Sequence, residues 1–353
     1  MSALKLKAVV GTTIFGDDAA AWMDPTSAAW MPDMVSLSVW GQQLFGQLAM
    51  PALPLGSSSQ AVAAIAHVPA QVDTSDVFLV DLTESIAAVG GSALKVSGGG
   101  SGSGGGIVTS YTSGAPGAYN ISITFKGTWT ASLQNVFKAA ADRLSGIIIG
   151  DVKDVRINGK IIDDISISAE LSTIDGVGGV LGQAGPTLLR TGSYLPAAAT
   201  MQFDSADAQN YYNAGLFDEI VTHEMLHSVG FGSIWSFVGL TSGSSYIGAN
   251  AVSEYNKLVG GFAAGHGGST TLANGITLAM GAVPLETGGG SGTAGAHWSE
   301  AVFANELMTG YLNLPVSGST APADPLSMMS AASMRDLGYV TAAIPPVDIY
   351  VLI

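Results

Sequence analysis

Alternating and helically spaced apolar positions predict an ordered segment in the middle of the chain. Residues 119–126 alternate between apolar and polar, which is typical of a half-buried strand. Thr130 then marks the start of a predicted helix, whose apolar residues repeat at helical spacing over 133–144. A second alternating run covers 165–169, and 199–203 is a further candidate strand. Strand, helix, strand, strand and then a long helix is an α/β order.

The long helix is predicted to begin near residue 217 and to end at Gly230. Asp218 and Glu219 fall in its first turn, where carboxylates interact favourably with the helix dipole. Gly230 can adopt the left-handed conformation that ends a helix abruptly. Both ends of this helix are therefore marked in the sequence.

A Gly- and Ser-rich run at 98–106 divides the chain, and we expect a flexible linker over 98–118. The run matches G-x-G-x-x-G, but no strand–turn–helix pattern surrounds it, so a dinucleotide site is not expected. Residues 1–97 form an N-terminal module without evident chemistry, with a strand-like run at 77–82. A propeptide, an accessory domain and an integral part of the main fold all stay open for this module, and the linker is either natural or engineered.

The chain is acidic but weakly charged. Its 353 residues include 12 Lys+Arg and 27 Asp+Glu, which gives a formal net charge of −15. Such a charge repels phosphate backbones, so nucleic-acid binding is not expected. Charged residues make up only 11% and hydrophobic residues 47%, which indicates a folded chain. The absence of cysteine excludes disulfides, thiolate metal ligands and a cysteine-based latency switch.

No transmembrane segment is expected, and the secretion signals are weak. The uncharged stretch 34–56 contains Gln and Pro residues that suit a membrane span badly, and it favours a buried amphipathic helix. Near the start, a short apolar run at 8–15 is followed by two aspartates, which is not a convincing secretory signal. The final stretch 348–353 is an acidic residue followed by apolar residues, typical of either a C-terminal export signal or a last strand.

The helix from 217 to 230 carries the motif H-E-x-x-H at His223, Glu224 and His227. Residues i and i+4 lie on one helix face, so both imidazoles can bind one metal ion. Glu224 projects beside them, where it can hold a water molecule as a general base without being a ligand. Zinc is the expected ion, because it accepts imidazole nitrogen and tolerates an open position for water.

The residues alone leave the third metal ligand open, although a catalytic zinc site usually has three protein ligands. The compact form of the motif would place a third histidine at position 233, which is a serine here. One downstream histidine lies in a glycine-rich loop, another precedes helix-prone residues, and several carboxylates follow the helix. These candidates are His266, His297, Glu254, Glu286, Glu300 and Glu306.

Three segments together resemble the leishmanolysin-like branch of the metzincin zinc peptidases. They are HEMLHSVGFG at 223–232, HWSEAVFANELMTG at 297–310 and LSMMSAASMRDLGY at 326–339. In that family an insertion separates the helix glycine from the third histidine, and here the gap is 297 − 230 = 67 residues. The better-known eukaryotic members are rich in disulfides, so the cysteine-free chain is similar to a bacterial member.

The resemblance implies a zincin-like fold of the α+β or α/β class. It implies a twisted mixed sheet with the active-site helix, together with a smaller, mainly helical C-terminal subdomain. It also makes His297 the third ligand and Met308 the methionine of a turn beneath the metal. The chain then divides into an N-terminal module (1–97), a linker (98–118), an upper catalytic subdomain (119–235), an insertion (236–296) and a lower catalytic subdomain (297–353).

The activity implied is zinc-dependent endoproteolysis of protein or peptide substrates, with Glu224 as the general base. Tyr311 is a candidate to stabilise the oxyanion, and a packed tyrosine is the alternative. Gly179, Leu181 and Gln183 are candidates for an edge strand that binds an extended substrate, with a plain turn as the alternative.

Two other functions stay open beside the endopeptidase. One is a zinc hydrolase of another class, in which Glu300 or Glu306 is the third ligand; the other is an inactive secreted adhesion or binding protein. We expect an extracellular or cell-surface location, from the composition and the family resemblance. A Ca²⁺ site is a further expectation, with Asp204 and Asp207 as its candidate ligands.

Overall fold

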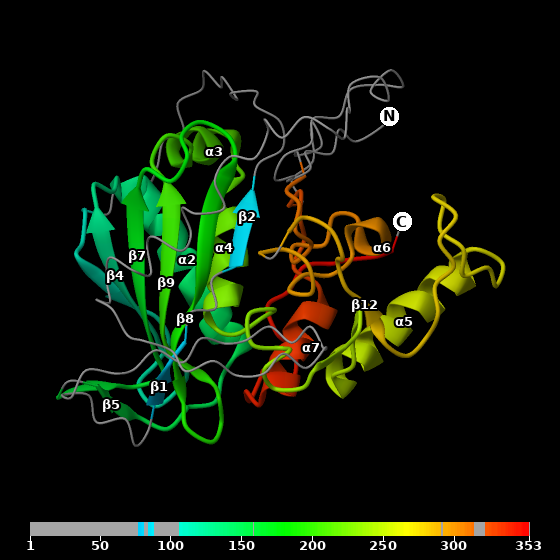
Figure 1. Ribbon diagram of the computed structural model, residues 1–353, viewed down its shortest axis with the longest axis horizontal. Coiled ribbons are helices and arrows are strands. Elements are labelled where there is room, and N and C mark those ends of the chain that lie inside the picture. The colour runs from blue at the N-terminus through cyan, green and yellow to red at the C-terminus, as the bar shows by residue number, and fades with distance from the viewer. Residues whose placement is uncertain are drawn as a thin grey trace, which may run out of the picture. The chain divides into compact units, whose positions relative to one another are not determined.

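The structure is a computed structural model of the chain (Figure 1). It describes residues 77–80, 84–87, 106–157, 159–290, 292–313 and 322–352. The helix expected within 34–56 and the glycine-rich run up to residue 105 lie outside the described residues.

A mixed sheet of seven strands in the described residues forms one layer of the fold. Its order is β1-β8-β9-β7-β4-β3, and β2 also pairs with β8. The three strands β4, β7 and β9 are parallel to one another, whereas all other pairs are antiparallel. The bounds are β1 Val77–Leu79, β2 Glu84–Ala87, β3 Ser110–Thr112, β4 Ile121–Gly127, β7 Ile165–Ser172, β8 Val180–Arg190 and β9 Pro196–Asp204. A separate hairpin consists of β5 (Val155–Ile157) and β6 (Lys160–Ile162).

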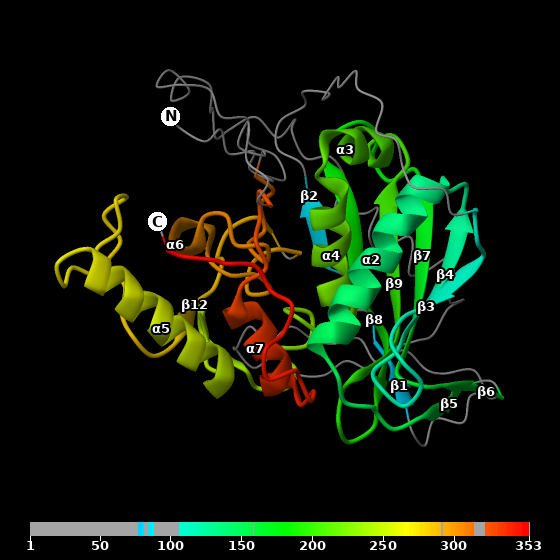
Figure 2. The ribbon, with the colours of Figure 1, turned by 180° about the vertical axis from the view of Figure 1, so that it is seen from behind.

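Two helices, α2 (Ala131–Ile147) and α4 (Phe217–Ser228), lie side by side on one face of this sheet (Figure 2). The Oγ1 atom of Thr130 accepts the N–H of Leu133 at 3.3 Å and caps α2, as predicted. The short helix α3 (Ala208–Ala214) precedes α4, and α4 packs against β8 and β9. The sequence patterns for β4, α2, β7, β9 and α4 are thereby confirmed.

Aromatic side chains hold the two helices against the sheet. The ring of Phe137 from α2 lies 5.2 Å from that of Phe203 in β9, and Phe203 lies 5.5 Å from Phe217 at the start of α4. All three are fully buried. Edge-to-face contacts of this kind add about 0.5–1.5 kcal/mol each beyond simple burial, so they fix the position of α4 above β8 and β9.

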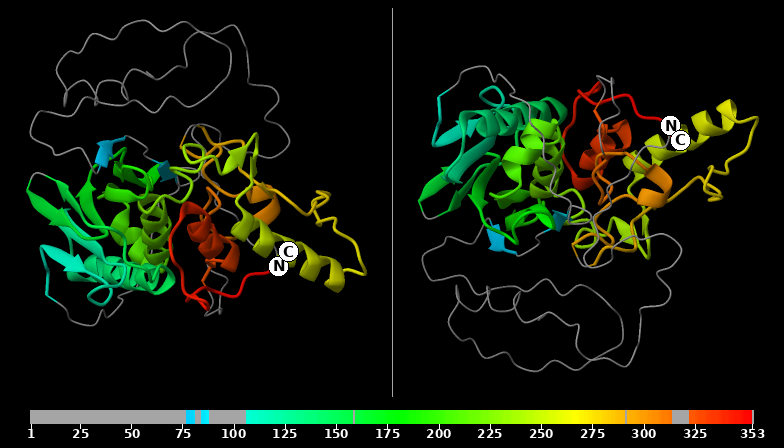
Figure 3. Two further views of the ribbon diagram at one scale, coloured as in Figure 1. Left: turned by 90° about the horizontal axis from the view of Figure 1, so that it is seen from below. Right: turned by 90° about the horizontal axis from the view of Figure 1, so that it is seen from above.

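Within the described residues, the C-terminal part from 236 onward contains three helices and a small three-stranded sheet, but most of its residues lie in loops, so it is not mainly helical as expected. Helices α5 (Ala249–Gly265) and α7 (Met328–Leu337) pack together, in yellow and red in Figure 3, and α6 is Glu300–Phe303. The Asp336 carboxylate of α7 accepts the N–H groups of Asn250 and Ala251 at 2.8 and 3.0 Å, which caps α5. The small sheet contains β10 Thr241–Ser242, β11 Ser245–Tyr246 and β12 Val283–Pro284.

The N-terminal boundaries drawn from the sequence differ from the structure. Strand β3 lies inside 98–118, the expected linker, and pairs with β4. Strands β1 and β2 lie inside 1–97 and both pair with β8, so this part of the N-terminal module belongs to the main sheet. The glycine-rich composition ends at residue 106, and the residues SYT of β3 that follow favour a strand, so the flexible segment ends earlier than 118.

A buried pair of carboxyl groups makes the stability of the fold depend on pH. Glu219 in the first turn of α4 accepts the N–H of Ala323 at 2.7 Å. Burial, and then the neighbouring Asp324, raises the pKa of Glu219 from 4.5 to about 9, and burial raises the pKa of Asp324 to about 7. The folded state therefore favours protonated Glu219, so stability falls as the pH rises from the unfolded pKa toward the folded one.

Replacing Glu219 with Gln should stabilise the metal-free chain at alkaline pH. The Gln side chain stays neutral and keeps an oxygen for the N–H of Ala323. In calorimetry we expect Glu219→Gln to raise the Tm at about pH 8.5, with a smaller gain at about pH 5. Glu170→Gln on the exposed side of β7 is the control and should change neither value. An equal Tm change at the two pH values would contradict the assigned protonation.

Candidate metal centre

The last two turns of α4 present His223 and His227 on one helix face. Both side chains are completely buried, although histidine side chains are often partly exposed to solvent. The helix ends directly after them, because Gly230 adopts φ 106° and donates its N–H to the carbonyl of His227 at 3.0 Å. The helix-terminating role predicted for Gly230 agrees with this geometry.

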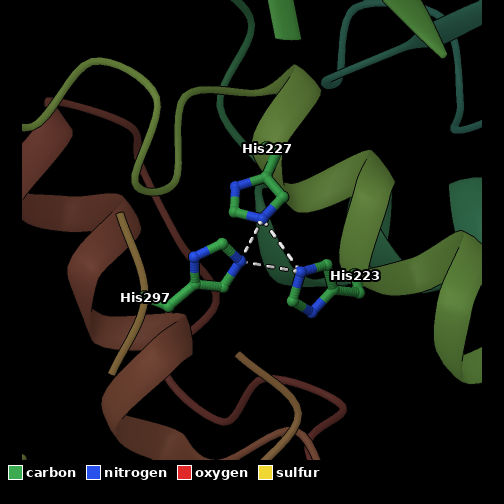
Figure 4. Close-up of side chains that lie close together, drawn as sticks. All are labelled: His223, His227 and His297. Atoms are coloured by element: carbon green, nitrogen blue, oxygen red, sulfur yellow. Dashed lines mark hydrogen bonds between the residues drawn. The ribbon is translucent and has the colours of Figure 1, made fainter. Parts of the chain in front are cut away.

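His297 comes from a distant part of the chain and meets the other two histidines (Figure 4). The Nε2 atoms are 2.9 Å apart for His223 and His227, and 3.0 Å from each of these to His297. Within the described residues, these three form the only completely buried group of His, Cys, Asp or Glu that could hold a metal ion. The structure therefore brings together the three histidines named from the sequence.

Backbone carbonyls fix how each ring is oriented. The Nδ1 atoms of His223, His227 and His297 lie 2.8, 2.8 and 3.0 Å from the carbonyls of Leu307, Phe231 and Thr293. A carbonyl can only accept a hydrogen bond, so each Nδ1 carries a proton. Each neutral ring therefore turns the lone pair of Nε2 toward the centre, and three lone pairs face one another along the dashed lines of Figure 4.

The rings are held in the neutral form that binds metals. Burial, with the neighbouring His297, lowers the pKa of His223 to about 3, and burial lowers that of His297 to about 4. The pKa of His227 is lowered well below its usual value, first by burial and then by the other two rings. Three buried acceptors with no donor between them are unfavourable alone, and a cation at their centre satisfies all three. The donor set therefore fits a metal ion.

Glu224 lies between the histidines in sequence and packs toward β8. It is completely buried and does not belong to the histidine group. A Cβ atom added to Gly182 of β8 would lie 3.2 Å from the Cγ atom of Glu224, so glycine leaves room for this side chain. The Glu224 side chain thus follows His223 directly on α4 and packs against β8.

A close backbone contact brings the His297 segment up to α4. Gly232, with φ 68°, lies so near Ala296 that an added Cβ would be 2.0 Å from the Ala296 carbonyl oxygen. Trp298 then packs on Phe231 and Trp235, at ring distances of 5.3 and 4.7 Å. A side chain at position 232 would therefore push His297 away from the other ligands.

The turn around Met308 is tied to both histidine segments. Leu307 provides the carbonyl that orients His223, and the carbonyl of Met308 accepts the N–H of Trp298 at 3.0 Å. The Glu306 carboxylate accepts the N–H of Met308 at 2.6 Å and that of Ser327 at 3.0 Å. Met308 is fully buried here, and its place beneath a metal stays a prediction.

The alternative ligands lie elsewhere. Glu306 uses its oxygens in the turn just described, and neither it nor Glu300 belongs to the histidine group. His266 lies at the end of α5, where its Nδ1 atom faces the carbonyl of Phe262 at 2.8 Å. Its ring stacks on Phe262, so its surroundings hold it away from the metal ligands.

The strand predicted to bind substrate is paired with neighbouring strands in this structure, and its role toward substrate stays a prediction. Gly179 precedes β8, whereas Leu181 and Gln183 lie within it. Strand β9 pairs with one side of β8, and β2 pairs with the other, with Ser85 opposite Gln183. Alternation along a strand does not reveal which neighbour covers its edge.

The predicted calcium site and the predicted role of Tyr311 are considered next. The predicted calcium ligands are engaged with the backbone: Asp204 accepts N–H groups from residues 174 to 176, and Asp207 accepts the N–H of Gly178. Because these oxygens already have donors, the arrangement does not support a calcium site. Tyr311 is half-buried, and burial raises its pKa with help from the nearby Glu286 and Glu300. Its role toward an oxyanion stays a prediction.

The groups that position the three histidines are not evident from the sequence. The carbonyls of Phe231, Thr293 and Leu307 have no sequence signal, because every residue has a carbonyl. Gly182 and Gly232 are visible as glycines, and the requirement for close backbone approach explains them.

A comparison with protein-family models found no match, and a comparison with curated proteins also found none. Within the described residues, no helix combines the length and the apolar character needed to cross a bilayer.

The contribution of each histidine can be measured through metal binding. We expect His297→Ala to weaken zinc affinity at least about 100-fold, because it removes a ligand and not merely a neighbour of one. His266→Ala is the matched control and should bind zinc like the natural chain. Competition with a chromophoric chelator gives both affinities.

Glu300→Gln and Glu306→Gln complete this experiment and should retain zinc. Loss of zinc in a glutamate variant together with full binding by His297→Ala would contradict the three-histidine centre.

Proposed function

We propose that this chain is a zinc-dependent endopeptidase of a leishmanolysin-like kind. The observation that carries the proposal is the buried convergence of three Nε2 lone pairs from His223, His227 and His297. Glu224, the residue after His223 on the same helix, is also completely buried. The three histidines are the donor set of a catalytic site that keeps one metal position open for water or substrate.

Zinc is the ion proposed for this site. Neutral imidazole suits several divalent metals, and zinc binds three such ligands without requiring redox chemistry or a larger coordination shell. A mixed sheet with α4 packed against one of its faces is compatible with a zincin-like arrangement. The resemblance of 223–232, 297–310 and 326–339 to metzincin segments adds support, and a bacterial origin goes with it.

The residues around the site have separate roles in peptide hydrolysis. When bound, the metal supplies Lewis acidity that polarises a peptide carbonyl and makes water more acidic. Glu224 accepts a proton from the attacking water and later delivers it to the leaving amine. Tyr311 donates a hydrogen bond to the oxygen that becomes negatively charged, and Met308 supports the ligands from its turn.

The rival functions have less support. A glutamate-liganded zinc hydrolase needs Glu300 or Glu306 at the centre, whereas the buried group contains histidines alone. An inactive adhesion protein has no need for a buried glutamate after the first histidine of the motif, for which Gly182 leaves room. The proposed location is outside the cell or at its surface, and cell fractionation of the native host would test it.

The role of Glu224 can be separated from metal binding. We expect Glu224→Gln to bind zinc normally and to lose about 10²–10⁴-fold in kcat on a quenched peptide library, because it removes the base and keeps the ligands. Zinc content and peptide cleavage are measured on the same sample.

His266→Ala is the control for purification and zinc loading of a variant chain, and it should cleave peptides like the natural chain. Near-normal turnover by Glu224→Gln with full zinc would contradict the assigned base. Zinc-loaded natural chain that cleaves no peptide under any condition would contradict the peptidase proposal.

A further inference from the structure

Strand β2 lies on the edge of β8 that runs beside the metal centre. Ile86 is opposite Gly182, the residue that leaves room for Glu224, and Ser85 is opposite Gln183. Strand β2 also contacts α4 directly, as its cyan arrow beside α4 in Figure 1 shows. A segment from the N-terminal region is thus placed next to the proposed catalytic residues.

An extended peptide cannot use this edge while β2 occupies it. Peptides that bind to a sheet usually add as a strand and pair with the free N–H and C=O groups of the edge. Along 182–184, β9 already pairs with one side of β8 and β2 with the other. Both sets of backbone groups are therefore taken in this part of β8.

The metal centre is closed in the same arrangement. His223, Glu224, His227 and His297 are each 0% exposed. A substrate carbonyl must reach these atoms, so some part of the chain has to move first.

Strand β2 is well suited to be the part that moves. It has four residues and pairs only with β8 among the described strands, and its register shifts between Ile86 and Ala87. By contrast, β8 and β9 pair along most of their length. Short edge strands with few neighbours open at lower free energy than central strands.

We propose that β2 is a built-in occupant of the substrate-binding edge of β8. The chain then rests with its metal centre closed, and it becomes active when residues 84–87 leave the edge. This inference rests on the proposed peptidase function and adds its regulation. It needs no cysteine, which the chain lacks.

A reversible cross-link tests this in the full chain. Ser85→Cys/Gln183→Cys places two thiols on directly opposed residues, whose Cα separation in antiparallel strands suits a disulfide. Because the natural chain has no cysteine, these are the only thiols present. After zinc loading and oxidation with diamide, peptide cleavage should fall at least about tenfold and return on reduction, with zinc content unchanged.

In the matched control, the disulfide links β1 to β8 and leaves β2 free. Leu79→Cys/Leu188→Cys joins β1 to the other half of β8, away from Gly182. Its oxidation should leave cleavage unchanged. Equal activity of the oxidised and reduced Ser85→Cys/Gln183→Cys chain would overturn the proposal.

Release of β2 should have the opposite effect. In Ser85→Pro/Ile86→Pro two consecutive N–H groups are lost, and at least one of them faces β8. We expect kcat/KM to rise about tenfold or more, since the open fraction of the chain increases. Phe78→Pro in β1 is the control and should give no such rise.

A second readout separates this inference from the peptidase proposal. In the cobalt-loaded chain, acetohydroxamate that reaches the metal changes the visible spectrum, whether or not peptides are cleaved. Slower spectral change in the oxidised Ser85→Cys/Gln183→Cys chain than in the reduced one supports a closing role for β2. The same rate in both would overturn that role, and a difference in rate without any peptide cleavage would overturn the peptidase function alone.

Discussion

Three hydrogen bonds from imidazole Nδ1–H groups to backbone carbonyls determine what the centre of this protein can do. They fix the tautomer of each ring, so that every Nε2 atom presents a lone pair and no proton to the common point. If one carbonyl moved, the ring could turn over and offer a donor in place of an acceptor. Metal binding and the catalytic role proposed for Glu224 both depend on this arrangement.

The three carbonyls differ in their distance along the sequence from the histidines that they orient. Phe231 follows His227 by four residues and Thr293 precedes His297 by four, so each of these contacts forms within a local turn. Leu307 is 84 residues from His223, and it reaches that ring only after the Met308 turn has packed beside α4. The buried Glu306 carboxylate holds the same turn against α7. The geometry at His223 is therefore a property of the whole fold.

The sequence predicted the elements and the ligands better than their surroundings. Periodicity located β4, α2 and α4 because each has one buried face. The spacing in H-E-x-x-H placed His223 and His227 on one face, and the choice of His297 over His266 followed from family resemblance. Strand partners were not predictable in this way, since β1 and β2 are too short to show periodicity and their pairing with β8 spans about a hundred residues. The carbonyl acceptors are invisible to any argument from residue type.

The long separation of the three histidines would give a bound metal a second role. His227 and His297 are 70 residues apart, and the chain has no cysteine to close so large a loop covalently. A cross-link that closes a loop of this length removes enough entropy from the unfolded chain to be worth about 4 kcal/mol. Because the ion is held by the folded arrangement, its free concentration would enter the folding equilibrium directly. In this protein the metal would take the place that disulfides have in many extracellular domains, as an exchangeable tie between the two ends of the site.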